Sequence, residues 1–192
     1  MGVKERKERE REARKQTILE AAIEIFSRKG YEKTNMEEIA EKAELSKGVI
    51  YYYFESKEKL FEELVLSEVS KYYRSAYEAI KEKKDYKEIF SALLDFHISY
   101  FSKRKEILSL IFPFGKSSPV FINGELKEKI KEVRSPIEER IMNLLGEKGI
   151  TISELLWSYI IGISVKMTQK KDIKKIKEEI EIFKQMLEGV LK

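Results

Sequence analysis

The sequence predicts an all-α fold of about nine helices, and three observations lead to this prediction. Apolar residues recur at intervals of three and four along nearly the whole chain, as on the buried face of a helix. No segment alternates apolar and polar residues with the period of two that a half-buried strand requires. Residues that favour helix N-caps, among them Asn35, Ser46 and Ser56, stand directly before the periodic segments.

A charged arm and one helix are predicted in the first thirty residues. Residues 4–15 are almost wholly charged, and we expect a solvated, partly disordered arm there, with an extension of the first helix as the alternative. The first helix should end at Gly30, because glycine readily adopts the left-handed conformation that follows many helices. Its apolar stripe consists of Ile18, Ala22, Ile25 and Phe26.

Three N-caps divide the next segment. Asn35, with Glu38 three residues later, forms a capping box for a short second helix. Ser46 caps a third helix that is shorter still, and Ser56 caps a long fourth helix that runs through Ile80.

The rest of the chain is expected to form a helical bundle. A capping box of Asp85 and Glu88 begins a helix that is apolar nearly all round, and such a helix belongs in the middle of a bundle. Asn123 should cap the next helix, and Thr151 with Glu154 the one after. The last helix begins near residue 172 with apolar residues in coiled-coil spacing: Ile173, Ile176, Ile180, Phe183, Leu187 and Val190.

Composition excludes several functional classes. The 192 residues suffice for one or two domains with a hydrophobic core. The absence of cysteine excludes disulfide scaffolds, thiolate metal sites and cysteine nucleophiles. A single histidine, His97, argues against a multi-histidine metal centre or a histidine-assisted triad. With no nucleophile–base pair and no glycine-rich phosphate loop, we expect no metal, no cofactor and no enzymatic activity.

The start of the chain indicates the cellular compartment of the protein, and the charge balance limits how it could bind DNA. No apolar signal segment opens the chain and no run of about 18 apolar residues occurs, so we expect a cytoplasmic protein that does not bind a membrane. The net charge is only +4, and residues 1–60 contain 14 Lys and Arg against 13 Asp and Glu. Any binding to DNA must therefore depend on where the charges lie.

Two short helices joined by a tight turn predict a helix-turn-helix, whose second helix lies in the major groove. The residues at the start of that helix suit this placement. The N-terminus capped by Ser46 offers N–H groups to a phosphate, and Lys47 can reach a phosphate or a guanine edge. Gly48 lets a DNA backbone approach closely, and residues 51–53 are tyrosines with hydroxyls for phosphate and rings for sugar or thymine.

The stretch GYEKTNMEEIAEKAELSKGVIYYYFESKEKLF, residues 30–61, closely resembles the signature of the TetR family of transcriptional regulators. The signature contains a Gly-aromatic pair, a threonine, a short helix with Ile-Ala, and then Ser-x-Gly, tyrosines, phenylalanine and Ser-Lys-Glu. One position departs from it: the family usually has glycine where this chain has Glu44. That residue either adopts a left-handed conformation with some strain or shifts the turn.

The resemblance implies a homodimeric repressor with a DNA-binding domain at residues 1–56 and an effector-binding and dimerisation domain at residues 57–192. Its partners would be a palindromic DNA operator, a second copy of the chain and a small apolar or amphipathic effector. The implied DNA-binding residues are Thr34, Asn35, Ser46, Lys47, Gly48, Val49, Tyr51, Tyr52, Tyr53 and Lys57. Phe54 matches a core position.

Aromatic residues concentrated on two helices and one loop suggest an apolar effector cavity. The candidate lining residues are Phe96, His97, Tyr100, Phe112, Phe114, Phe121, Trp157 and Ile161. For His97 a buried, hydrogen-bonded histidine is the favoured interpretation, and a polar contact to a ligand is the alternative. The segment PFGKSSPVF could be a mobile gate to the cavity.

The last two helices predict a dimer interface of four helices, with packing within one chain as the alternative. Its candidate residues are Trp157, Ile160, Ile176, Ile180, Phe183 and Leu187. An activator, a regulator that responds to a protein partner and a helical adaptor that uses its helix-turn-helix for protein contacts stay open as alternatives.

Overall fold

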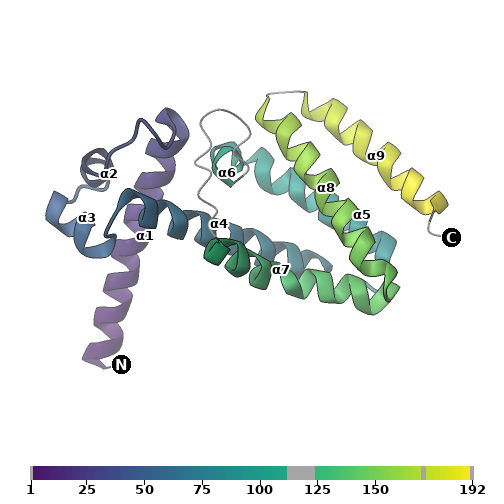
Figure 1. Cartoon of the computed structure of the whole chain (residues 1–192), viewed down its shortest axis with the longest axis horizontal. Helices are drawn as coiled ribbons and strands as arrows, with labels where there is room; N and C mark the ends of the chain where they lie inside the picture. The colour runs from purple at the N-terminus through teal and green to yellow at the C-terminus, as the bar shows by residue number, and fades with distance from the viewer. Residues whose placement is uncertain (1, 112–123, 170–171, 191–192) are drawn as a thin grey trace.

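The computed structural model is an elongated, all-helical molecule with three helices at one end and a helical bundle at the other (Figure 1). It describes residues 2–111, 124–169 and 172–190, except for the side chains of residues 109 and 187–190. Within these ranges it has nine helices and no strand, which confirms the predicted fold class. The helices are α1 (Val3–Lys29), α2 (Met36–Lys42), α3 (Lys47–Tyr53), α4 (Lys57–Ile80), α5 (Tyr86–Ser102), α6 (Lys105–Ile111), α7 (Gly124–Leu145), α8 (Lys148–Thr168) and α9 (Ile173–Val190).

The charged N-terminal segment is helical, so the expectation of a partly disordered arm is wrong. Helix α1 begins at Val3 and continues without a break to Lys29, and its residues 3–14 are all exposed. Charges at i,i+4 spacing support it, including an ion pair between Arg6 and Glu10 at 3.2 Å. Such pairs stabilise a helix by a few tenths of a kcal/mol each, about 0.2–0.5.

The predicted N-caps of α2, α3 and α4 are confirmed. The side chain of Asn35 accepts a hydrogen bond from the N–H of Glu38 at 2.9 Å, and Ser56 accepts one from Lys59 at 3.2 Å. Helix α6 lies in a stretch for which the sequence had suggested no boundaries. The predicted start at Thr151 is wrong, because α8 already begins at Lys148.

The start of α8 depends on a close approach to α7. A Cβ atom at Gly149 would lie 2.8 Å from the Cα of Met142, so only glycine allows this packing. The apolar periodicity begins about one turn after Lys148, and the start predicted from it therefore lies too late in the chain.

Two hydrophobic cores divide inside α4. Leu60, Leu64 and Val69 pack with the buried faces of α1, α2 and α3, whereas Tyr72 and Ile80 pack in the bundle. The expected domain division at residues 56 and 57 coincides with the start of α4, but the packing changes a dozen residues later. Helix α4 is thus shared by both halves of the molecule, and α7 lies alongside it (Figure 1).

The bundle buries α5 between the other helices, as the all-apolar pattern predicted.

Helix α8 has the length and composition of a membrane-spanning helix, with a mean hydropathy of 1.3. The central helix of a helical bundle has the same properties, and α8 turns Leu156, Ile160 and Ile163 into this core. Arg140 on α7 donates hydrogen bonds to the carbonyl oxygens of Ile80 and Lys83, and so caps the C-terminal end of α4.

Candidate DNA-binding surface

The turn between α2 and α3 is a tight helix C-cap with a non-glycine residue in the left-handed position. Glu44 has φ of 56°, and it alone among the described non-glycine residues has a positive φ. The N–H of Leu45 donates to the carbonyl of Ala40 at 2.9 Å, and that of Glu44 to Glu41 at 3.0 Å, which is the Schellman pattern. The chain therefore tolerates a left-handed glutamate and keeps the turn in place.

Helix α3 presents one buried face and one exposed face. Ile50 is fully buried and Phe54, directly after the helix, is 3% exposed, so the core position predicted for Phe54 is confirmed. On the opposite side Tyr52 is 76% exposed and Tyr51 40% exposed. Large aromatic side chains that stay exposed on a seven-residue helix are a candidate binding surface.

The polar end of α3 lies on the same exposed side. Ser46 caps the helix by accepting a hydrogen bond from Val49, and Lys47 follows with an exposed side chain. The ammonium of Lys47 pairs with Glu37 on α2 and lies 5.9 Å from the ring centroid of Tyr51. The hydrogen bond to Glu37 raises the pKa of Lys47, so the side chain stays charged.

Gly48 has open space in front of it. A Cβ atom built at this position would meet no heavy atom within 4 Å, and the residue is exposed. No contact among the described residues therefore requires glycine here.

Two of the predicted DNA-binding residues have structural roles. Thr34 is 3% exposed, and its hydroxyl donates a hydrogen bond to the carbonyl of Gly30 at 2.8 Å. The ammonium of Lys57 donates to the carbonyls of Tyr31 and Thr34, each at 3.0 Å, and lies 4.3 Å from the ring centroid of Tyr31. Thr34 closes the loop between α1 and α2 on itself, and Lys57 holds this loop against the start of α4. Asn35 is exposed, while Val49 and Tyr53 are half-buried beside the tyrosine face.

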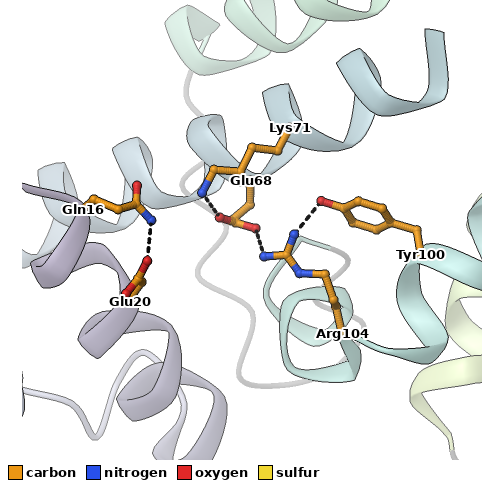
Figure 2. Close-up of polar contacts among 6 residues, drawn as sticks. All are labelled: Gln16, Glu20, Glu68, Lys71, Tyr100 and Arg104. Carbon is orange, nitrogen blue, oxygen red and sulfur yellow. Dashed lines mark hydrogen bonds and ion pairs between the residues drawn. The ribbon is translucent and has the colours of Figure 1, made fainter. Parts of the chain in front are cut away.

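A charged group that the sequence analysis did not single out lies buried in the middle of α4. Glu68 is 2% exposed and accepts hydrogen bonds from Lys71 at 2.7 Å and from Arg104 at 2.8 Å. Arg104 also donates to the hydroxyl of Tyr100 at 2.8 Å (Figure 2). The network ties α4 to the junction of α5 and α6. Glu68 falls on the apolar stripe between Leu64 and Tyr72, and a charge on that stripe was the available signal.

His97 is fully buried and hydrogen-bonded on both ring nitrogens, as the favoured interpretation held. Its Nδ1 lies 2.9 Å from the hydroxyl of Tyr72, and its Nε2 lies 3.0 Å from the hydroxyl of Ser164. The Ser164 hydroxyl donates to the carbonyl of Ile160, so the Nε2–H donates to Ser164 and Nδ1 accepts from Tyr72. Burial lowers the pKa of His97 to about 3, and the ring is neutral at pH 7.

The predicted cavity residues are only partly brought together. Phe96, His97 and Tyr100 gather around Tyr72, with ring centroids 5.4 to 5.8 Å from it. Trp157 packs its ring against Tyr73, whereas Ile161 lies on the exposed side of α8. Phe112, Phe114 and Phe121, together with the proposed gate PFGKSSPVF, lie outside the described residues.

Most of the predicted dimer residues are buried within the chain itself. Trp157, Ile160, Ile176 and Ile180 are at most 7% exposed and pack in the core of the same chain, which is the alternative that the sequence left open. Phe183 is half-buried against Tyr159, and the side chain of Leu187 lies outside the described residues. The apolar residues that α8 and α9 do expose are Leu155, Ile161, Ile182 and Met186.

Helix α3 follows a tight turn and exposes two tyrosines and a lysine, and the long helix α4 connects this unit to the bundle. This arrangement is that of a helix-turn-helix transcriptional regulator. Residues 18–64 match the family described as "Bacterial regulatory proteins, tetR family". The chain belongs to this TetR family.

Known relatives agree with this assignment. The uncharacterized HTH-type transcriptional regulator YhgD of Bacillus subtilis is 31% identical over 133 residues, 67% of this chain and 69% of YhgD. The fatty acid metabolism regulator protein of B. subtilis is 28% identical over 138 residues, 72% of this chain and 69% of the relative. The crystal structure of the transcriptional regulator FadR from B. subtilis in complex with stearoyl-CoA has the same fold, with a TM-score of 0.69, 22% identity and coverage of 86% of this chain and 94% of FadR. These relatives are regulators of transcription, and the chain is not an enzyme.

Proposed function

We propose that the protein is a cytoplasmic, homodimeric repressor that binds a palindromic operator and is released by a small amphipathic effector. The observation that carries the proposal is the exposed face of α3, which combines a capped N-terminus, a lysine and two exposed tyrosines on one short helix. Two such helices must lie about one turn of DNA apart, roughly 34–36 Å, to reach successive major grooves.

The residues of this face would divide the work between bases and backbone. Lys47 and Tyr52, with Val49 beside them, would contact the edges of bases in the groove. Asn35, Ser46, Tyr51 and Tyr53 would contact phosphates or sugars. Thr34 and Lys57 would act indirectly, by fixing the loop on which Asn35 sits.

Gly48 allows binding and folding to be separated. Gly48→Ala should leave the fold intact, since the added methyl group meets open space, and alanine is favoured in helices by about 1 kcal/mol. If a DNA backbone packs on this position, the same methyl group should weaken operator binding. We expect a Gly48→Ala protein with unchanged or higher thermal stability and lower affinity.

Operator binding can be tested on a duplex selected by the wild-type protein from a random-sequence library, with fluorescence anisotropy at fixed salt. Lys47→Ala should lower the affinity by tenfold or more, since a good base contact is worth about 1–3 kcal/mol. Tyr51→Phe should lower it less. Unchanged affinity in both variants would refute the assignment of α3 as the recognition helix.

A second copy of the chain would cover the exposed apolar face of α8 and α9. Leu155 and Ile182 are 62% and 59% exposed, and Gly162 on α8 has open space that would admit a neighbouring helix. Native mass spectrometry of the purified protein should detect a dimer. The double variant Leu155→Glu and Ile182→Glu should be monomeric, and a wild-type monomer would contradict the two-helix mechanism.

The effector is expected to bind near Trp157. The indole Nε1 of Trp157 and the hydroxyl of Ser153, one turn earlier, are buried without a hydrogen-bond partner among the described residues. A ligand with an acceptor group would satisfy them. Because FadR was crystallised with stearoyl-CoA, a long-chain acyl thioester is the first effector to test.

Trp157 is the single tryptophan of the chain and reports on this site directly. Titration with stearoyl-CoA should change its fluorescence and release the operator duplex, whereas free coenzyme A should do neither. The coupling would pass through α4, to which Glu68 and Arg104 fasten the bundle (Figure 2). An effector acts only through different affinities for the DNA-bound and free conformations.

A further inference from the structure

The N-terminal half of α1 contributes to neither core. The buried face of α1 begins at Ile18, whereas residues 3–14 are fully solvated and project away from the rest of the molecule (Figure 1). At 1.5 Å per residue this extension is about 18 Å long, close to half a turn of DNA. Something other than folding must account for a rigid element of this size.

All the net positive charge of the first sixty residues lies on this extension. Residues 4–15 contain seven Lys and Arg and four Glu, an excess of three in a chain whose net charge is +4. Residues 16–60, which form the helix-turn-helix proper, contain seven Lys and Arg and nine Glu. The unit expected to bind a polyanion is therefore negatively charged without its extension.

The cations of the helix-turn-helix proper are also largely occupied. Most of them pair with carboxylates or carbonyls of the same chain: Lys29 with Glu38, Lys42 with Glu24, Lys47 with Glu37, Lys59 with Glu62, and Lys57 with two carbonyls. Little uncompensated positive charge remains there to attract phosphates.

Four of the seven cations of the extension lie on one face of the helix. Lys4, Lys7, Arg11 and Arg14 follow one another at intervals of three and four and form one stripe, here called the basic stripe. Three carboxylates form a separate stripe: Glu5, Glu8 and Glu12. None of the four side chains of the basic stripe has an ion-pair partner in the part of the chain that the structure describes.

The basic stripe faces the same side as the buried face of α1. The spacing of three and four continues from Arg14 to Ile18, Ala22 and Ile25, which pack against the other helices of the helix-turn-helix. Lys15, beside the stripe, points the same way: it pairs with Glu63 on α4 and lies 5.9 Å from the ring centroid of Phe54, directly after α3. The basic stripe thus extends along the side of the molecule on which α3 ends.

We propose that the extension of α1 is a second DNA-binding element, whose basic stripe binds phosphates of the backbone flanking the bases that α3 reads. The proposal rests on the DNA-binding function proposed above. We assign the DNA backbone as the partner of the basic stripe for two reasons. Cations at helical spacing without ion-pair partners among the described residues complement a row of phosphates, and the stripe adjoins the recognition helix. Such contacts add affinity and fix the docking angle without reading sequence.

Salt dependence measures these contacts. Each phosphate contact contributes about 0.9 to the slope of log K against log salt concentration. In the variant Lys7→Gln, Arg11→Gln, Arg14→Gln of the full chain, the magnitude of the slope should fall by about 2.7 per bound subunit, or about 5.4 for the dimer, on the duplex selected by the wild-type protein and on a random duplex alike. The matched control on the other face, Glu5→Gln, Glu8→Gln, Glu12→Gln, should keep the wild-type slope or steepen it.

A charge-swapped variant separates orientation from net charge. Lys7→Glu, Glu8→Lys, Arg11→Glu, Glu12→Arg keeps the composition but moves two cations off the stripe, and it should bind like the glutamine variant. Wild-type slope and affinity in the glutamine variant would overturn the proposal, and wild-type binding by the swapped variant would overturn the oriented stripe. If the wild-type protein binds no duplex at any salt concentration, the proposed DNA-binding function falls as well, and circular dichroism identifies any variant that has lost its helix.

Discussion

On α3, Tyr51 and Tyr52 are exposed, whereas on α4 Tyr72 is 3% exposed and surrounded by Phe96, Tyr100 and Phe101. The hydroxyl of Tyr72 is hydrogen-bonded to His97, and burial raises the pKa of Tyr72 well above its ordinary value. Tyrosine therefore forms an exposed surface on α3 and part of the buried core on α4.

The charged groups differ in the same way. The pair of Lys47 and Glu37 is open to solvent on both sides, and such pairs contribute little to stability. Glu68 is buried, and its charge is compensated by Arg104 and Lys71, without which it would destabilise the fold. Substitutions in the bundle should therefore lower the free energy of unfolding, and those on the recognition face should lower the affinity for DNA.

The largest loss of stability is expected when Glu68 loses Arg104, one of its two partners among the described residues. Arg104→Met should lower the free energy of unfolding by about 2–3 kcal/mol, less than for a fully buried pair because the Arg104 side chain is 35% exposed. Urea denaturation measures the loss. The double variant Glu68→Leu, Arg104→Met should recover much of it, since no unpaired charge remains buried. A double variant as unstable as the single one would contradict this explanation.

Acid should destabilise the bundle through His97. The pKa of His97 is about 3 when folded, below the ordinary value of 6.5, so the unfolded chain binds the additional proton between these pH values. The stabilisation is complete above pH 6.5 and is lost as the pH falls toward 3. At pH 5 the loss should be about 2 kcal/mol relative to pH 7. His97→Gln should flatten this pH dependence in urea titrations, and an unchanged slope would show that other groups cause it.

Removing single hydroxyls compares the two tyrosine sites directly. Tyr72→Phe should cost about 1–2 kcal/mol of stability, because Nδ1 of His97 then loses its donor in a buried site. Tyr52→Phe should change the unfolding free energy by less than about 0.5 kcal/mol. Thermal denaturation and DNA anisotropy on both proteins give the test. A large loss of stability in Tyr52→Phe alone would show that the exposed tyrosine, and not the buried one, is needed for folding.

The smallest effect is expected at the turn. Glu44→Gly relieves a left-handed glutamate but frees the unfolded chain, so stability should rise by no more than about 1 kcal/mol. Loss of a carboxylate beside DNA should also tighten operator binding. Glu44→Gln is the control, because it removes the charge and keeps the conformation. Equal DNA affinity for both substitutions would assign the gain to charge, and tighter binding by the glycine variant alone would assign it to the backbone.

Local patterns were sufficient for the helix-turn-helix and the start of α4. The caps at Asn35, Ser46 and Ser56, the burial of Phe54 and the exposure of Lys47 and Tyr52 all follow from signals within a few residues along the chain. Where a role depended on a distant partner, the prediction was incomplete. Lys57 reaches carbonyls 23 and 26 residues away, and its position in the motif gave no sign of this.

The sequence by itself determined the helical fold, the helix-turn-helix and the absence of cysteine chemistry, because periodicity, capping and composition are properties of short segments. Only the tertiary structure decided which faces of α8 and α9 are free, since an apolar stripe fits its own core and a partner equally well. It also decided the burial of Glu68 and the direction of the basic stripe. Those depend on how separate helices pack, and packing is set by contacts between residues far apart in sequence.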